Sequence, residues 1–338
     1  MTTDLVECVP NFSEGRDKEI IDSITSVMTE IEGIRLLDVD MGADFNRTVV
    51  TIVGPSSSIV EAALAGTKVA MESIDMSNHS GEHARMGAID VVPFIPIRGV
   101  TMDDCVSLAE EYAKRAAAEL DLGVYLYAKA AKKPERVRLP DIRRGEYEAL
   151  EDKLENPSNA PDYGPSKFNP KSGVTASGAR PVLIAYNVNL STADKSPANK
   201  IAGAIRTSGV LLKDKDGNKI VDEDGKPMRK PGKFQSLQAA GWMYDEDTAQ
   251  VSMNLLDFQS TGLYEVTEEI SRLANELSLK VTAGELVGLI PEAALVEAGL
   301  SYDPNSSDPV TTAIRELKLD VLDEFDPEAR IIERAAGE

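Results

Sequence analysis

The chain's two histidines lie together in one short polar segment, residues 79–87 (HSGEHARMG). Histidine titrates near neutral pH, so His79 and His83 are the side chains best suited to accept and return a proton there. Most single histidines are structural. Here, however, Glu82, Arg85 and two glycines crowd the same segment, between a predicted helix and a predicted strand. Because functional groups concentrate at such boundaries, the segment is a candidate site for proton transfer.

The same segment also matches a zinc-binding pattern. His79-x-x-Glu82-His83 has the residue order of the inverted zinc peptidases. Such a site needs both imidazoles on one helix face and a further carboxylate from elsewhere. Gly81, with serine and asparagine nearby, disfavours a helix through this stretch. A pattern this short also arises by chance, so we expect no metal here.

A second group of charges follows the predicted strand that ends near Asp40. Asp38 and Asp40 lie at the end of that strand, and Arg47 follows a glycine-containing loop. An arginine fork binds a carboxylate through two hydrogen bonds, and an aspartate can hold an ammonium group. The residues could therefore grip an amino acid, or they could form a surface ion pair. The sequence leaves both interpretations open.

Composition disfavours several classes of protein. Lys and Arg number 36 against 57 Asp and Glu, a formal charge of −21, which disfavours a nucleic-acid-binding protein. No apolar run reaches the ~18 residues of a transmembrane helix, and the first residues do not resemble a signal peptide. No glycine-rich phosphate-binding motif occurs. Cys8 and Cys105 cannot build a disulfide framework, so we expect a cytoplasmic protein without membrane attachment.

The elements that must position these residues alternate along the chain. The patterns predict strands at 5–9, 34–39, 48–53 and 89–97 and helices at 17–31 and 56–74, followed by a helix at 102–120 and a strand at 123–128. The later half repeats the order. A strand at 181–190 is followed by a polar stretch and an apolar-periodic helix that reaches residue 205, and then come strands at 237–243 and 250–256, a helix at 265–277 and an apolar stretch at 286–290. Each half reads β-α-β-β-α-β. This order predicts an α+β fold of two ferredoxin-like subdomains, residues 1–179 and 180–338, each with helices on one face of its sheet.

Two irregular stretches interrupt this order. Residues 132–178 are rich in proline and glycine and locally basic, and they carry the aromatic residues Tyr147, Tyr163 and Phe168. A loop of this length is usually functional or disordered, and the aromatic anchors favour a functional one. Residues of about 208–235 hold two Asp-Gly turn pairs, which predicts a surface hairpin insertion.

Several stretches of the chain resemble glutamate formimidoyltransferases. The similarity extends from about residue 5 to residue 290, nearly the whole chain. The stretches are VECVPNFSEG (6–15), LLDVD (36–40), NRTV (46–49), GEHxRMGAxDV (81–91), PFIP (93–96), GEYEAL (145–150), APDxGP (160–165) and NLLDF (254–258). A long match in polar loops is much more specific than the short zinc pattern.

The resemblance implies a reaction and an architecture. A formimidoyltransferase moves the formimino group of N-formimino-L-glutamate to N5 of tetrahydrofolate in histidine degradation. The family's catalytic histidine falls on His83, which would act as general base and then general acid without a metal. The resemblance also implies a folate tunnel between the two subdomains and a homodimer. It does not separate formimino transfer from formyl transfer between 5-formyltetrahydrofolate and glutamate, and a non-catalytic folate-binding protein is a further alternative.

The resemblance also implies roles for further residues of this sequence. Lys167, Lys171 and Arg180 would attract the glutamate carboxylates of folate. Asp40, Arg47, Glu82 and Arg85 are the weaker candidates for binding the amino-acid substrate. The family's folate-contacting segment falls on Gly164, Pro165, Ser166, Lys167, Phe168, Asn169, Pro170, Lys171, Ser172 and Gly173.

The chain also departs from the family pattern. Ala84 follows His83 where many members have proline, and the insertion at 208–235 is longer than expected. Some relatives carry a fused helical cyclodeaminase domain. Residues 301–338 are too few for that domain, so we expect a separate enzyme to release ammonia.

Overall fold

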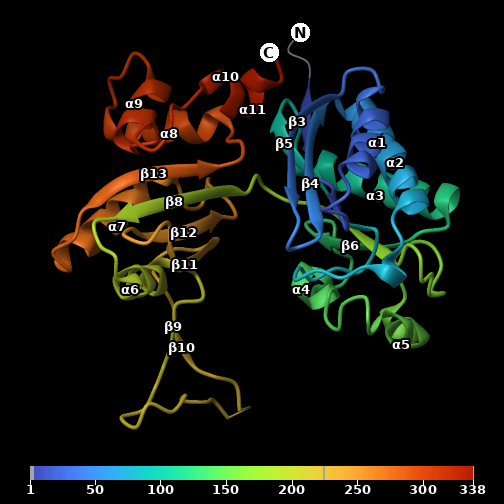
Figure 1. Cartoon of the computed structure of the whole chain (residues 1–338), viewed down its shortest axis with the longest axis horizontal. Coiled ribbons are helices and arrows are strands. Elements are labelled where there is room, and N and C mark those ends of the chain that lie inside the picture. Colours follow the sequence, from blue (N-terminus) through green and yellow to red (C-terminus); the bar gives the residue numbers. More distant parts are fainter. Residues whose placement is uncertain (1–3, 224, 338) are drawn as a thin grey trace. The chain divides into compact units, whose positions relative to one another are not determined.

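The chain divides into two compact units, residues 1–181 and 182–338 (Figure 1). The structure is a computed structural model and describes residues 4–223 and 225–337. Within these residues, every helix is too short or too polar to cross a lipid bilayer.

The first unit is built on the predicted β-α-β-β-α-β order. Its strands form the sequence β3-β4-β1-β5 across an antiparallel sheet, with β2 continuing β1 between β4 and β5. The elements are β1 (Leu5–Cys8), β2 (Asn11–Phe12), α1 (Lys18–Thr29), β3 (Arg35–Gly42), β4 (Arg47–Gly54), α2 (Ser56–Ser73) and β5 (Ile89–Arg98). This strand order is that of a ferredoxin-like fold, which confirms the fold class.

Local sequence explains the helices of this unit. Asp17 accepts the backbone N–H groups of Glu19 and Ile20 and so begins α1, as N-cap aspartates do. The buried face of α1 includes Ile21 and Met28. Helices α1, α2 and α3 (Met102–Leu120) pack side by side over the sheet (Figure 1), and their apolar faces form the main core with it.

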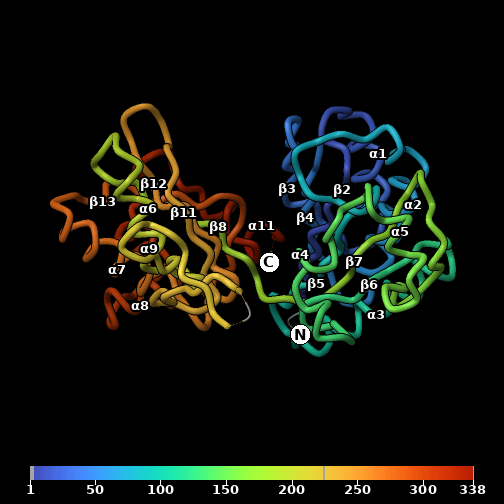
Figure 2. Tube along the Cα trace, turned by 90° about the horizontal axis from the view of Figure 1, so that it is seen from below, coloured from blue at the N-terminus to red at the C-terminus, as the bar shows by residue number. Residues whose placement is uncertain are grey.

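The sheet of the first unit is larger than the sequence predicts. Strand β7 (Val174–Ala179) pairs in parallel with both β5 and β6 (Gly123–Ala128), and the three lie next to one another (Figure 2). The prediction of an irregular loop through residue 178 was therefore wrong at its end. The sequence VTASGA is wholly buried, but after Val174 and Thr175 it consists only of Ala, Ser and Gly, so it has few of the β-branched and aromatic side chains that identify strands.

The rest of the predicted loop also contains short helices. They are α4 (Leu139–Ile142), α5 (Leu150–Glu155) and one-turn 3-10 helices at Pro134–Arg136 and Pro157–Asn159. Leu150, Leu154 and Ile142 are buried in a second, smaller core against Tyr125 and Val174. The basic stretch is therefore packed on the first unit.

The second unit repeats the β-α-β-β-α-β order around a four-stranded sheet, β11-β12-β8-β13. Its elements are β8 (Ile184–Leu190), α6 (Lys195–Ile205), β11 (Leu237–Met243), β12 (Ala249–Leu255), α7 (Leu263–Glu276) and β13 (Val281–Val287). The last strand was predicted at 286–290. It lies earlier, and two of its three buried residues, Ala283 and Gly284, are small, which weakens the apolar signal of β13.

Two further parts complete the second unit. The insertion is a ribbon closed by the short strands β9 (Val210–Leu211) and β10 (Arg229–Lys230), which extends away from β11 in Figure 1. After β13, the chain forms four helices that the sequence patterns do not predict: α8 (Glu292–Tyr302), α9 (Pro309–Glu316), α10 (Pro327–Arg330) and α11 (Ile332–Ala335).

Candidate functional site

The histidine segment is a loop between α2 and β5. A 3-10 turn at Met76–Asn78 is capped by Asp75, whose carboxylate accepts the Ser77 N–H at 3.0 Å. The chain then runs without helix through His83, as Gly81 predicts. A Cβ on Gly81 would lie 2.2 Å from the Phe45 carbonyl oxygen, so only glycine allows the β3–β4 loop to approach this closely.

This close approach brings Arg47 to His83. Arg47 is the first residue of β4, and its Nη1 contacts Nε2 of the imidazole. A guanidinium has only donors, so Nε2 accepts this hydrogen bond and the neutral ring carries its proton on Nδ1. Nδ1 is buried and faces the Ala84 backbone without a well-formed hydrogen bond. The lone pair suited to proton transfer is therefore at Nε2, next to Arg47.

The surroundings of His83 favour the neutral ring. Burial, Arg47 and Arg143 lower the pKa of His83 to about 4, in that order. Burial and Arg143 also lower the pKa of Arg47, whereas Asp90 and Asp40 raise it. Two guanidinium groups thus act on one half-buried imidazole. At neutral pH the ring is uncharged and binds a proton weakly.

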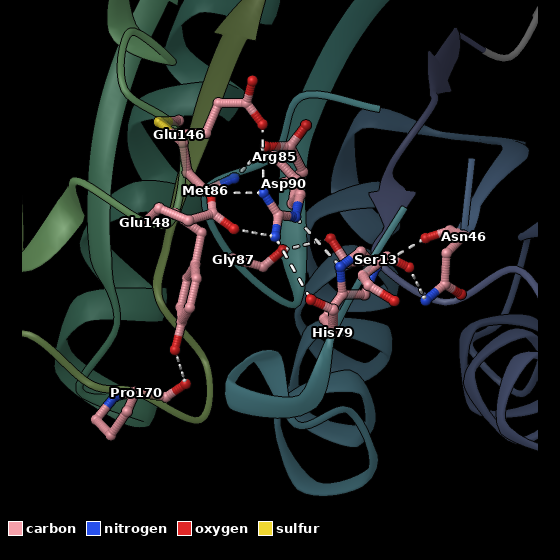
Figure 3. A network of polar contacts seen from close by, with 12 residues as sticks. Ser13, Asn46, His79, Arg85, Met86, Gly87, Asp90, Glu146, Glu148 and Pro170 are labelled. Carbon is pink, nitrogen blue, oxygen red and sulfur yellow. Dashed lines mark hydrogen bonds and ion pairs between the residues drawn. The ribbon is translucent and has the colours of Figure 1, made fainter. Parts of the chain in front are cut away.

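His79 has a different environment. Its Nε2 donates to the Asn46 carbonyl oxygen at 2.9 Å, and its Nδ1 accepts from Nε of Arg85 at 3.2 Å (Figure 3). Both ring nitrogens are therefore occupied, and burial lowers the pKa of His79. The ring connects Arg85 with the residue preceding Arg47. These contacts indicate a positioning role for His79.

Arg85 is engaged by two carboxylates from the loop after α4. Its guanidinium donates to Glu148 at 2.5 and 2.8 Å and to Glu146 at 3.2 Å (Figure 3). The Arg85 side chain is only 8% exposed, so these pairs are shielded more than a surface pair. The contacts tie the 143–150 loop to the histidine segment. An open cavity of about 450 Å³ adjoins them, lined by His79, Ser80, Gly81, Arg85, Gly145, Glu146 and Glu148.

A second, buried ion pair joins the same two segments. Asp90, at the start of β5, is 1% exposed; one carboxylate oxygen accepts the Met86 N–H at 2.9 Å and the other binds Nη2 of Arg143. Burial raises the pKa of Asp90, and Arg143 opposes this effect. Neither residue has a role that the sequence patterns predict. The available signal was an aspartate inside the apolar stretch AIDVV.

Two of the predicted substrate-binding residues are exposed. Asp40 lies on β3, where it pairs in register with Val49 of β4 and acts on Arg47 through its charge. Glu82 is also exposed, and its N–H donates to the Asp44 carbonyl at 3.4 Å. The structure thus places Arg47 at His83, Arg85 in the supporting network, and Asp40 and Glu82 on the surface.

The predicted folate segment ends against the histidine segment. The Ala88 N–H donates to the Ser172 carbonyl at 2.9 Å, and the Met76 N–H to the Lys171 carbonyl at 2.9 Å. Gly173 has φ +63, and a Cβ there would lie 2.1 Å from the Met86 carbonyl oxygen. Residues 171–173 therefore need this glycine to reach the histidine segment.

The remainder of the folate segment is more open. Ser166, Lys167 and Asn169 are exposed. The half-buried Phe168 ring lies 5.6 Å from that of Tyr147, whose hydroxyl donates to the Pro170 carbonyl at 2.5 Å. Cationic, polar and aromatic side chains thus follow each other along one packed loop.

Comparison with known proteins covers both units. The family model "Formiminotransferase domain, N-terminal subdomain" matches residues 5–180, and "Formiminotransferase domain" matches residues 185–336. The chain is 46% identical, over 97% of its length, to Formimidoyltransferase-cyclodeaminase of Sus scrofa, and it spans 59% of that relative. It is 40% identical to Glutamate formimidoyltransferase of Streptococcus pyogenes serotype M1 and 41% identical to that of Thermoplasma acidophilum. Each match covers 88% of this chain, and 93% and 92% of the respective relatives.

Proposed function

The chain belongs to the formiminotransferase family, and from this premise we propose that it transfers the formimino group of N-formimino-L-glutamate to N5 of tetrahydrofolate. Histidine degradation is the pathway that needs this step. The observation that carries the proposal is the contact of Arg47 with Nε2 of the His83 imidazole, inside the family's Gly-Glu-His segment. Relatives named Glutamate formimidoyltransferase support it.

His83 is the proposed proton carrier. Tetrahydrofolate supplies the acceptor nitrogen. This nitrogen, N5, bonds to the formimino carbon and gives a tetrahedral adduct. His83 takes the N5 proton at Nε2 and returns it to the glutamate nitrogen as the bond between that nitrogen and the formimino carbon breaks. Arg47 binds a carboxylate of the amino acid beside the ring, and much of the rate comes from holding the two substrates together. His79 and Arg85 hold the loop that carries His83.

The segment 164–173 fits a folate. Lys167 is exposed and can bind the carboxylates of a ligand, and the Phe168 ring can contact an aromatic ligand. Within the described part of the chain, the buried Ser172 Oγ has no hydrogen-bond partner, so a polar group of a ligand could satisfy it. We propose that these residues bind tetrahydrofolate.

Neither histidine is suited to a metal. His79 uses both ring nitrogens in the protein network, and the Nε2 of His83 faces a guanidinium. The positive guanidinium group beside each ring disfavours a metal cation between the two histidines. We therefore propose chemistry without a metal at this site.

A steady-state assay tests the proposal. Tetrahydrofolate is supplied with N-formimino-L-glutamate or with N-formyl-L-glutamate, with and without EDTA. We expect faster turnover of the formimino donor and the same rate with the chelator. Turnover of the formyl donor alone would move the chain to formyl transfer. No turnover of either donor, with folate binding intact, would favour a binding protein.

A further inference from the structure

We propose that Arg143 is a second carboxylate-binding residue, which acts with Arg47 as a two-guanidinium receptor for a glutamate-type dicarboxylate beside His83. The identity of the dicarboxylate as the amino-acid donor rests on the proposed function. Asp90 is the positioning residue that holds Arg143 in place. Arg143 lies outside the stretches that resemble glutamate formimidoyltransferases.

The loop that carries Arg143 is fixed to the histidine segment by crossed ion pairs. Arg143 binds Asp90 of the β5 segment, and Arg85, on the loop before β5, binds Glu148. The turn between these contacts is tight: the Glu146 N–H donates to the Arg143 carbonyl at 2.7 Å, and Gly145 has φ +85. Because each segment gives one cation and one anion to the other, Arg143 has a defined position, with its side chain 13% exposed.

Arg47 lies beside His83 without a carboxylate in contact. Phe12 of β2 pairs with Thr48 on β4 and with Ile89 on β5, so Arg47 and Asp90 lie at the same end of these strands, and Asp90 binds Arg143. Arg143 accordingly lowers the pKa of both His83 and Arg47. Within residues 4–223 and 225–337, the Arg47 guanidinium has no ion pair with a carboxylate; Asp40 and Asp90 act on it only through their charge. A half-buried guanidinium of this kind is stabilised by a bound anion.

The charged groups that act on His83 or on Arg47 come from several elements. Arg47 lies on β4 and Asp40 on β3, Asp90 on β5, and Arg143 follows α4. On its own loop are His79, Glu82 and Arg85, of which Arg85 is already paired and Glu82 is exposed. The two arginines are therefore the groups that an incoming dicarboxylate meets next to the ring.

Occupancy of this receptor would change His83. A carboxylate that draws the Arg47 N–H away exposes the Nε2 lone pair. It also compensates the two positive charges that weaken proton binding by the ring. Substrate binding and proton affinity are then coupled, and by linkage each strengthens the other. The coupling explains how a ring that binds a proton weakly in the free protein becomes an effective base.

Glutarate is the probe for the receptor, because it has both carboxylates and no transferable group. The Cε1 resonances of the two histidines are followed by NMR at pH 7 while glutarate is added. We expect a saturable shift at His83 and little change at His79. Arg143→Gln should raise the glutarate Kd at least tenfold. The matched control is Arg144→Gln, whose side chain is 80% exposed and should change Kd less than twofold. Equal Kd values in Arg143→Gln and wild type would overturn the proposal.

Arg143→Lys provides a second variant that keeps a charge opposite Asp90 and so protects the fold. An ammonium cannot donate the two parallel hydrogen bonds of a guanidinium, so we expect a threefold to tenfold weaker glutarate affinity. An unchanged affinity would also overturn the proposal.

Pteroyl-L-glutamate is titrated in parallel. If it alone, and not glutarate, gave an Arg143-dependent shift, the carboxylates would belong to folate and the assignment to the donor would be wrong. Binding of glutarate without any transfer activity would instead remove only the proposed function.

Discussion

At the scale of single residues, the two histidines differ in what is free to react. His83 has a lone pair beside the Arg47 guanidinium, whereas both ring nitrogens of His79 are used by Asn46 and Arg85. A proton carrier needs a free nitrogen within hydrogen-bond reach of the substrate. The two residues are therefore expected to respond differently to substitution.

We expect His83→Ala to lower kcat by about 10²- to 10⁴-fold, the usual contribution of a general acid–base group, with little change in folate Kd. His79→Ala is expected to lose less activity, because it disturbs the position of Arg47 and leaves the imidazole of His83 in place. The measurements are kcat with N-formimino-L-glutamate and folate Kd by fluorescence. Turnover at the wild-type rate in His83→Ala would exclude this role, and equal losses in both variants would leave the proton carrier unassigned.

At the scale of elements, the site depends on a loop that returns to the histidine segment just before β7. The Gly173 backbone passes so close to Met86 that a side chain cannot be accommodated. This contact links the proposed folate segment to the segment of His83. Its loss is expected to affect folate binding and stability together.

Gly173→Ala tests this link, with Gly217→Ala as the control. Both glycines have positive φ, +63 and +85, but a Cβ at Gly217 meets nothing within 4 Å. The control should cost about 1 kcal/mol from the left-handed backbone alone. Gly173→Ala adds the collision and should cost at least about 2 kcal/mol more, with folate binding weakened more than tenfold. Urea unfolding and a folate titration measure both effects. Equal stability of the two variants would contradict the proposed packing.

At the scale of the whole molecule, the dominant property is an acidic surface around a locally basic site. The net charge of −21 repels anionic ligands at a distance, so nearby cations must provide the attraction. The arginines that do so are partly buried, and this burial couples the site to stability. The homodimer, the cytoplasmic location, the separate cyclodeaminase and the folate tunnel stay predictions.

The free energy of unfolding is expected to decrease as the pH is lowered, partly because of His83. The ring has a pKa of about 4 in the folded chain and about 6.5 when unfolded, so the unfolded chain binds more protons between these values. The contribution of the His83 ring to the free energy of unfolding is complete above pH 6.5 and is lost as the pH falls towards 4. Because the ring is only half-buried, we expect on the order of 1 kcal/mol. Urea unfolding from pH 7 to pH 5 should show a shallower decline in His83→Gln than in wild type. Parallel curves would show that His83 is not held neutral by the fold.

Local patterns explain what the sequence predicts well. The repeated β-α-β-β-α-β order follows from apolar periodicity, and Asp17 and Gly81 set a helix start and a non-helical loop through their own backbone chemistry. Strand β7 escaped prediction because its small residues pack only through their neighbours in the sheet. The same limit applied to the shift of β13.

Patterns within the chain suffice for the repeated β-α-β-β-α-β order, the family and the segment that holds His83, because each depends on residues near one another in the sequence. Which charges meet at that segment depends on the tertiary fold. Arg47, Asp90 and Arg143 come from separate elements, and Glu148 reaches Arg85 across 63 positions. Such contacts depend on sheet register and on the close approaches that glycines allow. No spacing along the chain encodes them, so the proposed partner of Arg47 emerged from the fold.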